Sequence, residues 1–130
     1  MQNHDYFKTI KVEREDSRII VYCIQKIVDL ENGVLYWEVE MEQVLEELGN
    51  RILIVDFSGV DILASAALQF LIRLLFCSKE KGFKFGLCGF QPNVLRTLKN
   101  TCLTDLLPIA KSADEIISNI NKRNINEAEK

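Results

Sequence analysis

The pattern of hydrophobic and polar residues divides the first half of the chain into two strands and a helix. Alternating apolar residues predict a weak strand at 7–12, and a run rich in β-branched and aromatic residues predicts a stronger one at 18–24. Asp16-Ser17 between them supplies the chemistry of a hairpin turn. Apolar residues at helical spacing from Val34 to Leu48 then predict a helix whose other side is rich in glutamate.

The second half alternates strands with helices. The near-continuous apolar run at 51–57 is typical of a strand covered on both faces, as in parallel sheets. The segments that follow are predicted to be a helix from Ser65 to Lys81, a strand at 83–88, a helix from Pro92 to Asn100, a short edge strand at 106–109, and a last helix capped by Ser112 with Glu115. From Asn121 onward the chain is polar and is expected to be disordered.

This order of elements predicts the fold class. Alternating strand–helix units indicate an α/β fold with a mostly parallel sheet of four to five strands and right-handed crossovers. The first two strands form an antiparallel hairpin at one edge, and about four helices complete the fold. We expect a single domain over residues 6–123, followed by a flexible polar tail at 124–130.

Composition narrows the class of protein. The chain has 130 residues, of which 48% are hydrophobic and 27% charged, so one domain can bury a core without metals or disulfides. The net charge of -3 argues against general nucleic-acid binding, which needs clustered cations. The polar start of the chain shows no secretory signal, and no apolar run approaches the roughly 20 residues of a membrane span. We therefore expect a cytoplasmic protein without a membrane segment.

The residues of most enzyme sites are missing. The four cysteines show no C-x-x-C spacing, and the only histidine, His4, lies near the start of the chain. Neither a phosphate-binding loop nor a dinucleotide-binding glycine pattern is present. A nucleophile and a base cannot be paired, so the sequence predicts no cofactor, no metal and no catalytic residue.

One segment carries a resemblance to a known family. Ile52 to Leu68 reads ILIVDFSGVDILASAAL, which resembles the signature of the STAS domain of bacterial anti-sigma-factor antagonists and of the cytoplasmic tails of sulfate transporters. In that family a hydrophobic strand ending in Asp leads through a short loop to Asp-Ser-Ser-Gly-Leu at the start of a helix. The segments Lys81–Gly89 and Val94–Ile109 are also similar, so the likeness covers most of residues 7–123.

The resemblance implies a partner switch. A family antagonist binds an anti-sigma factor that is also an ATP-dependent serine kinase, and phosphorylation of the first Ser of the motif releases it. That serine corresponds to Ser65. Ala64, Ala66 and Ala67 replace the neighbouring Asp, Ser and Gly, and Cys102 replaces a further family glycine. These departures put the regulation in doubt while leaving the domain intact.

Two interpretations of Ser65 remain open. A serine at the start of a helix meets free N–H groups and the positive end of the helix dipole, which favour a phosphate of about -1.5 to -2 charges. Alternatively, Ser65 is only the N-cap of the helix, contributing about 1 kcal/mol.

Helical spacing from Ser65 separates two sides of its helix. Ala67, Phe70, Leu71 and Leu74 point toward the sheet, whereas Leu68, Ile72 and Phe76 are expected to be at least partly exposed. Ile72 and Phe76 then form an apolar patch for a partner or a second copy, unless neighbouring segments cover them. The candidate partner-binding residues are Asp61, Ala64, Ser65, Leu68, Gln69, Ile72, Arg73 and Phe76.

The sequence thus predicts a non-catalytic regulatory domain that binds an anti-sigma factor, a serine kinase or a related signalling protein, with a homodimer as a further option. One alternative is an assembly subunit that does not depend on phosphorylation. Another is a sensor that binds a small ligand in a cleft at the loop ends of the parallel strands.

Overall fold

The computed structural model describes the backbone of residues 7–128 and the side chains of residues 7–123. Within this part the elements are β1 (Ile10–Arg14), β2 (Arg18–Cys23), β3 (Ile27–Val28), α1 (Val34–Glu47), β4 (Ile52–Asp56), β5 (Ile62–Leu63), α2 (Ser65–Lys81), β6 (Phe85–Cys88), α3 (Pro92–Asn100), the 3-10 turn η1 (Leu103–Asp105), β7 (Ile109–Ala110) and α4 (Ala113–Ala128). His4 and residues 129–130 lie outside the described residues.

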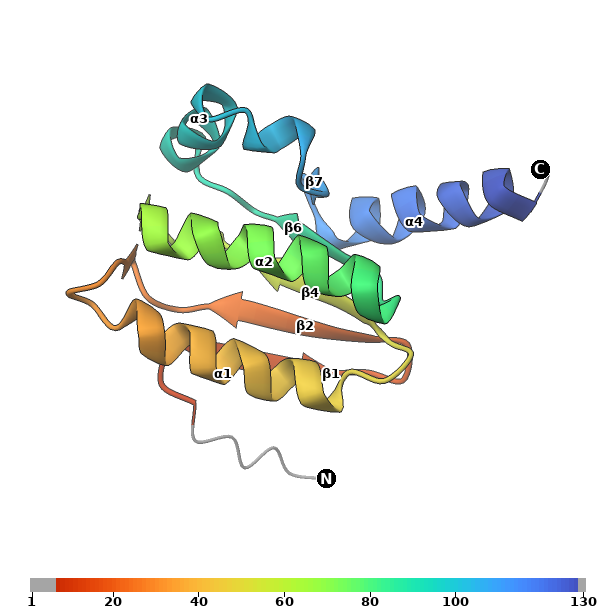
Figure 1. The fold of residues 1–130 in the computed structure, drawn as a ribbon, viewed down its shortest axis with the longest axis horizontal. Coiled ribbons are helices and arrows are strands. Elements are labelled where there is room, and N and C mark those ends of the chain that lie inside the picture. The colour runs from red at the N-terminus through yellow and green to blue at the C-terminus, as the bar shows by residue number, and fades with distance from the viewer. Residues whose placement is uncertain (1–6, 129–130) are drawn as a thin grey trace.

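The main sheet confirms the predicted fold class. Its five strands follow the order β1-β2-β4-β6-β7 (Figure 1). β1 is antiparallel to β2, and every other neighbouring pair is parallel. The apolar run of β4 lies in the middle of this order, which explains why it lacks alternation: a central strand is covered on both faces.

Helices cover the two faces of the sheet unequally. Leu53 and Val55 of β4 face the large core beneath α1 and α2, whereas Ile54 between them faces α4. The centre of the large core is Trp37 of α1, which is fully buried. Its ring meets Phe70 edge-on, with 5.0 Å between centroids. Such aromatic packing gives α1 and α2 a fixed position over the sheet.

The α4 face depends on one glycine. A Cβ atom added at Gly86 in β6 would lie 2.4 Å from Cγ2 of Ile116, so only glycine lets α4 lie this close to the sheet. The predicted cap of this helix is present, since the N–H of Glu115 donates to Oγ of Ser112 at 3.2 Å.

The structure corrects several element bounds. β1 begins at Ile10 rather than at residue 7, and the predicted strand at 106–109 is limited to β7, preceded by η1. α4 continues to Ala128 instead of ending near Asn121. β3 and β5, which pair with each other in a separate small sheet, were not predicted because two residues are too few to show a period. The domain limits at residues 6 and 123 stay a prediction.

Cys102 has an unusual backbone conformation. Its φ of 62° makes it the only non-glycine residue with positive φ in the described part of the chain. This left-handed region is the one in which glycine is favoured. The observation gives a physical reason for the family glycine that the resemblance implies at this position.

Candidate functional site

The candidate site is built at the start of α2. Ala64 is the N-cap, with φ -79° and ψ 169°, and Ser65 is the first residue of the helix. The methyl group of Ala64 cannot accept a hydrogen bond, and no side chain caps this helix end. The interpretation of Ser65 as the N-cap is therefore wrong, because the cap lies one residue earlier.

Ser65 is exposed and unengaged. Its hydroxyl makes no hydrogen bond to any residue that the structure describes. The carbonyl of Ala64 accepts the N–H groups of Ala67 at 3.0 Å and of Leu68 at 3.1 Å. The N–H groups of Ser65 and Ala66 precede these bonds at a helix start, where orphan donors and the dipole favour an anion.

The loop before α2 is held by its own hydrogen bonds. The N–H of Asp61 donates to the Lys26 carbonyl at 2.7 Å, and the N–H of Ala64 donates to the Val28 carbonyl at 3.0 Å. From α3, Nδ2 of Asn93 donates to the Asp61 carbonyl at 2.7 Å. The loop is thus fixed at both sides while the side chain of Asp61 stays exposed.

The ends of β4 and β6 form a rigid base under this loop. Oδ1 of Asp56, the last residue of β4, accepts the N–H of Ser58 at 2.8 Å. A Cβ atom at Gly89, whose φ is 77°, would lie 2.8 Å from that oxygen. Burial, followed by the Asp56 carboxylate, raises the pKa of the Cys88 thiol to about 11. Cys88 is therefore a buried thiol that stays neutral at neutral pH.

The outer side of α2 carries most of the predicted candidates. Gln69, Arg73 and Phe76 are exposed, and 63% of Phe76 is accessible. Arg73 forms an ion pair with Glu38 of α1 and lies 5.6 Å from the ring centroid of Phe70. Arg73 therefore links the two helices, and it presents a charge to a partner only in part.

Two predicted patch residues lie deeper than expected. Leu68 is 9% exposed and belongs to the large core, so its predicted exposure is wrong. Ile72 is half-buried and packs against the same core. The same core also includes Val94 and Leu98 of α3, so residues of another helix take part in the core to which this margin of α2 belongs. A lone helix wheel does not show such contributions.

Further exposed apolar residues were missed. Ile62, three residues before Ser65, is 50% exposed, and it pairs with Ile27 across the small sheet. Leu35 and Val39, at 65% and 52%, form a stripe four residues apart on the outer side of α1. The signal for this stripe was in the sequence, because these two positions fall outside the spacing of the buried Val34, Trp37 and Met41.

The start of α2 presents a small set of chemical groups. Among the side chains that the structure describes, no group of His, Cys, Asp and Glu is placed to hold a metal ion. No helix in the described part is long and apolar enough to cross a membrane. What the helix start offers is an exposed hydroxyl, orphan N–H donors and neighbouring apolar side chains, which suit a protein contact and an anion.

Comparisons with known proteins agree with the fold. The profile of the STAS domain matches residues 10–116. An anti-sigma factor antagonist from Mycobacterium paratuberculosis is similar in structure, with a TM-score of 0.70, 22% identity, and coverage of 87% of this chain and 93% of that one. The anti-sigma factor antagonist SpoIIAA in its unphosphorylated form gives 0.67, 10% identity, and coverage of 87% and 96%.

A third similar structure is a chain from the structure of the stressosome, a signal integration and transduction hub. It gives a TM-score of 0.62, 16% identity, and coverage of 88% of this chain and 98% of that one. No curated protein sequence matches the chain. At these identities the neighbours establish the fold.

Proposed function

Since the chain belongs to the STAS domain family, we propose that it is a non-catalytic regulatory domain that binds a signalling protein through the surface around Ser65. The observation that carries this proposal is the exposed, unengaged hydroxyl of Ser65 at the first position of α2. The partner we propose is an anti-sigma factor or an ATP-dependent serine kinase in the cytoplasm. The unphosphorylated SpoIIAA neighbour supports this class of partner.

We propose further that phosphorylation of Ser65 switches this contact. The phosphate would add about -1.5 to -2 charges beside the orphan N–H groups at the start of α2, which stabilise an anion. The domain itself therefore tolerates the modification. A partner that contacts Ser65 together with the half-exposed Ile62 would lose apolar contact and gain an unpaired charge, so binding is weakened.

A second candidate is an assembly subunit that does not depend on phosphorylation. The replacement of the motif by Ala64, Ala66 and Ala67 supports it, and so does the likeness to a stressosome component. The exposed apolar residues Leu35, Val39 and Phe76 would then contact another subunit or a second copy. For this candidate, Ser65→Ala behaves like the wild type in every binding assay.

The experiment is an affinity pull-down from the native cell, read by mass spectrometry with mapping of phosphorylated residues. The baits are the wild type, Ser65→Asp and the matched control Ser118→Asp on the exposed side of α4. The switch predicts that a kinase or anti-sigma factor is recovered with the wild type and Ser118→Asp but not with Ser65→Asp, and that phosphate is found on Ser65.

Recovery of the same partners by all three baits, with no phosphate on Ser65, would reject the switch and support the assembly subunit. Recovery of no protein partner by any bait would reject both candidates.

A further inference from the structure

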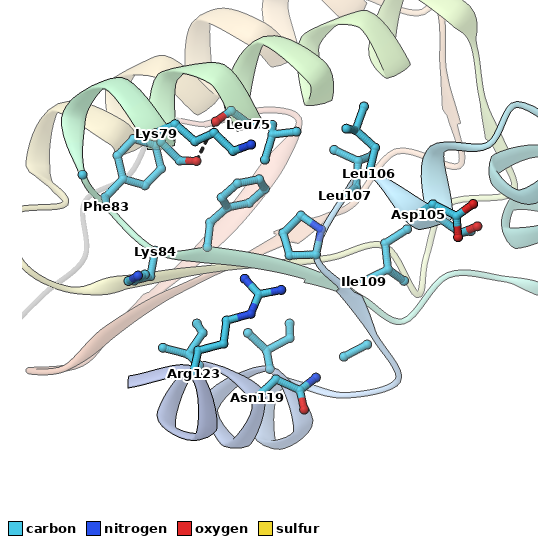
Figure 2. A pocket seen from close by; sticks show the side chains of 18 residues that line it. Leu75, Lys79, Phe83, Lys84, Asp105, Leu106, Leu107, Ile109, Asn119 and Arg123 are labelled. Atoms are coloured by element: carbon cyan, nitrogen blue, oxygen red, sulfur yellow. Dashed lines mark hydrogen bonds between the residues drawn. The ribbon is translucent and has the colours of Figure 1, made fainter. Parts of the chain in front are cut away.

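A cavity of about 630 Å³ opens at the end of α2 opposite to Ser65 (Figure 2). It lies between the last turns of α2, the start of β6 and α4. β7 pairs with β6 only at Leu87 and Cys88, so the first half of β6 pairs with β4 on one side and has no strand on its other side. The space that a longer edge strand would fill is left as the cavity.

The lining of this cavity combines polar side chains with accessible apolar ones. Leu106 is 49% exposed, and Phe83, Pro108 and Ile109 are half-buried. Behind them lie buried apolar side chains, among them Phe85 and Leu107. Ser78, a polar residue of the same lining, already donates its hydroxyl to the Leu75 carbonyl at 2.7 Å. The cavity therefore offers apolar contact beside polar groups, in a volume typical of small-molecule sites, about 300–1,000 Å³.

The rim is cationic. Lys79 of α2, Lys84 before β6 and Arg123 of α4 line the opening, and Asp105 is the one acidic residue among the lining side chains. Three positive charges and one negative charge give the opening a net charge of +2, whereas the whole chain carries -3. None of the three cations forms an ion pair within the residues that the structure describes.

Charges and apolar surface are separated within the cavity. Figure 2 shows Lys79 and Arg123 reaching toward it from opposite walls, with Asp105 at the other side beside Leu106 and Ile109. A ligand that places an anionic group between Lys79 and Arg123 would extend toward the accessible apolar side chains of Leu106 and Ile109. The arrangement matches a molecule with one charged end and one apolar end.

We propose that this cavity binds an amphiphile with a single aliphatic chain and a carboxylate head group. The chain would lie on the accessible apolar side chains and the carboxylate between Lys79 and Arg123, which are able to donate charge-assisted hydrogen bonds. The site lies at the opposite end of α2 from Ser65, so this proposal is tested independently of the proposed partner surface.

The first test titrates the wild-type protein with decanoate below its micellar concentration, followed by amide NMR. We expect saturable shifts at Phe85, Ile109 and Asn119, and weaker binding by about fourfold for each CH₂ removed from the chain. Decyltrimethylammonium, which has the same chain and a positive head, should bind at least tenfold more weakly. Equal binding of the two, or no saturable shift with decanoate, would overturn the proposal.

The second test uses variants of exposed residues, so the fold is expected to persist. Lys79→Glu with Arg123→Glu should weaken decanoate binding at least tenfold, whereas the matched control Lys99→Glu on α3 should leave it unchanged. Unchanged binding in the double variant would place the carboxylate elsewhere and contradict the proposal. If the double variant failed to fold, the comparison of the two head groups on the wild type would still decide.

Discussion

The two sides of α2 differ sharply although they share one backbone. Ala67, Phe70, Leu71 and Leu74 on the inner side are between 0% and 4% exposed. Ser65, Gln69 and Phe76 on the outer side are open to solvent. The inner side fixes the fold and the outer side is available for contacts. Stability and recognition should therefore respond to different substitutions along the same helix.

This contrast also separates the departures from the family motif. Ala67, in the place of the motif glycine, lies on the inner side and is fully buried. Ala64 is the N-cap, where a carboxylate would have accepted backbone hydrogen bonds. Among the positions that the resemblance assigns to the motif, Ser65 alone has the expected residue and is exposed. If that assignment holds, the departures concern packing and capping more than the hydroxyl.

The largest expected effect is on the inner side. Leu71→Ala removes a fully buried side chain from the core, so the free energy of unfolding should fall by about 2–5 kcal/mol. Urea unfolding followed by circular dichroism measures this change. Gln69→Ala, two residues away on the outer side, is the control and should change stability by less than about 0.5 kcal/mol. Equal losses in the two variants would refute the contrast.

High pH tests the buried face under α1 by another route. Burial raises the pKa of the Cys23 thiol to about 12 from 9.0. The unfolded chain therefore ionises first, and stability present below pH 9 is lost as pH rises toward 12. At pH 10 the loss should be about 1 kcal/mol.

Denaturation at pH 8 and pH 10 measures this loss. Cys23→Ala should reduce the pH dependence, while Cys102→Ala, at an exposed position, should leave it unchanged. The same pH dependence in the wild type and in Cys23→Ala would contradict the buried, neutral thiol.

The start of α2 offers a gain of similar size. Ala64→Asp places a hydrogen-bond acceptor at an N-cap whose backbone is already extended. The free energy of unfolding should therefore rise by about 1 kcal/mol. Gln69→Asp, which puts the same carboxylate in the body of the helix, should bring no gain. The midpoints of urea unfolding compare the stability of the two variants. A gain in stability in Gln69→Asp alone would be inconsistent with Ala64 as the N-cap.

The smallest expected effect on stability is at Ser65. Ser65→Glu adds a charge at the exposed first position of α2, beside the positive end of the helix dipole. The free energy of unfolding, measured by thermal denaturation, should therefore change by less than about 0.5 kcal/mol. Ala67→Glu, two residues further, buries the same charge and should destabilise the domain strongly. Similar melting temperatures for the two variants would show that α2 lacks the two sides described.

Much of the fold could be predicted from the sequence. The long helices show a helical period and the central strand shows a continuous apolar run, and both signals are local. α2 runs from Ser65 to Lys81 as predicted. The small sheet of β3 and β5 is too short to show a period. β7 is shorter than predicted, because η1 turns the chain away before Ile109.

The site could be predicted only in part. The place of Ser65 at the helix start follows from the resemblance together with helical spacing. Leu68 lies in a core shared by residues of several elements, and Ile62 pairs with Ile27, which lies far earlier in the chain. Both are tertiary effects that a local pattern does not contain.

The central claim is that the outer side of α2 near Ser65 is the surface that meets a protein partner. The most direct measurement is photo-crosslinking in the native cell, with benzoylphenylalanine placed at Gln69 in one variant and at Ser118 of α4 in another. Both positions are exposed, so the domain should fold in each case. The account predicts a covalent adduct with a signalling protein from Gln69 and none from Ser118. An adduct from Ser118 alone, or from neither position, would contradict it.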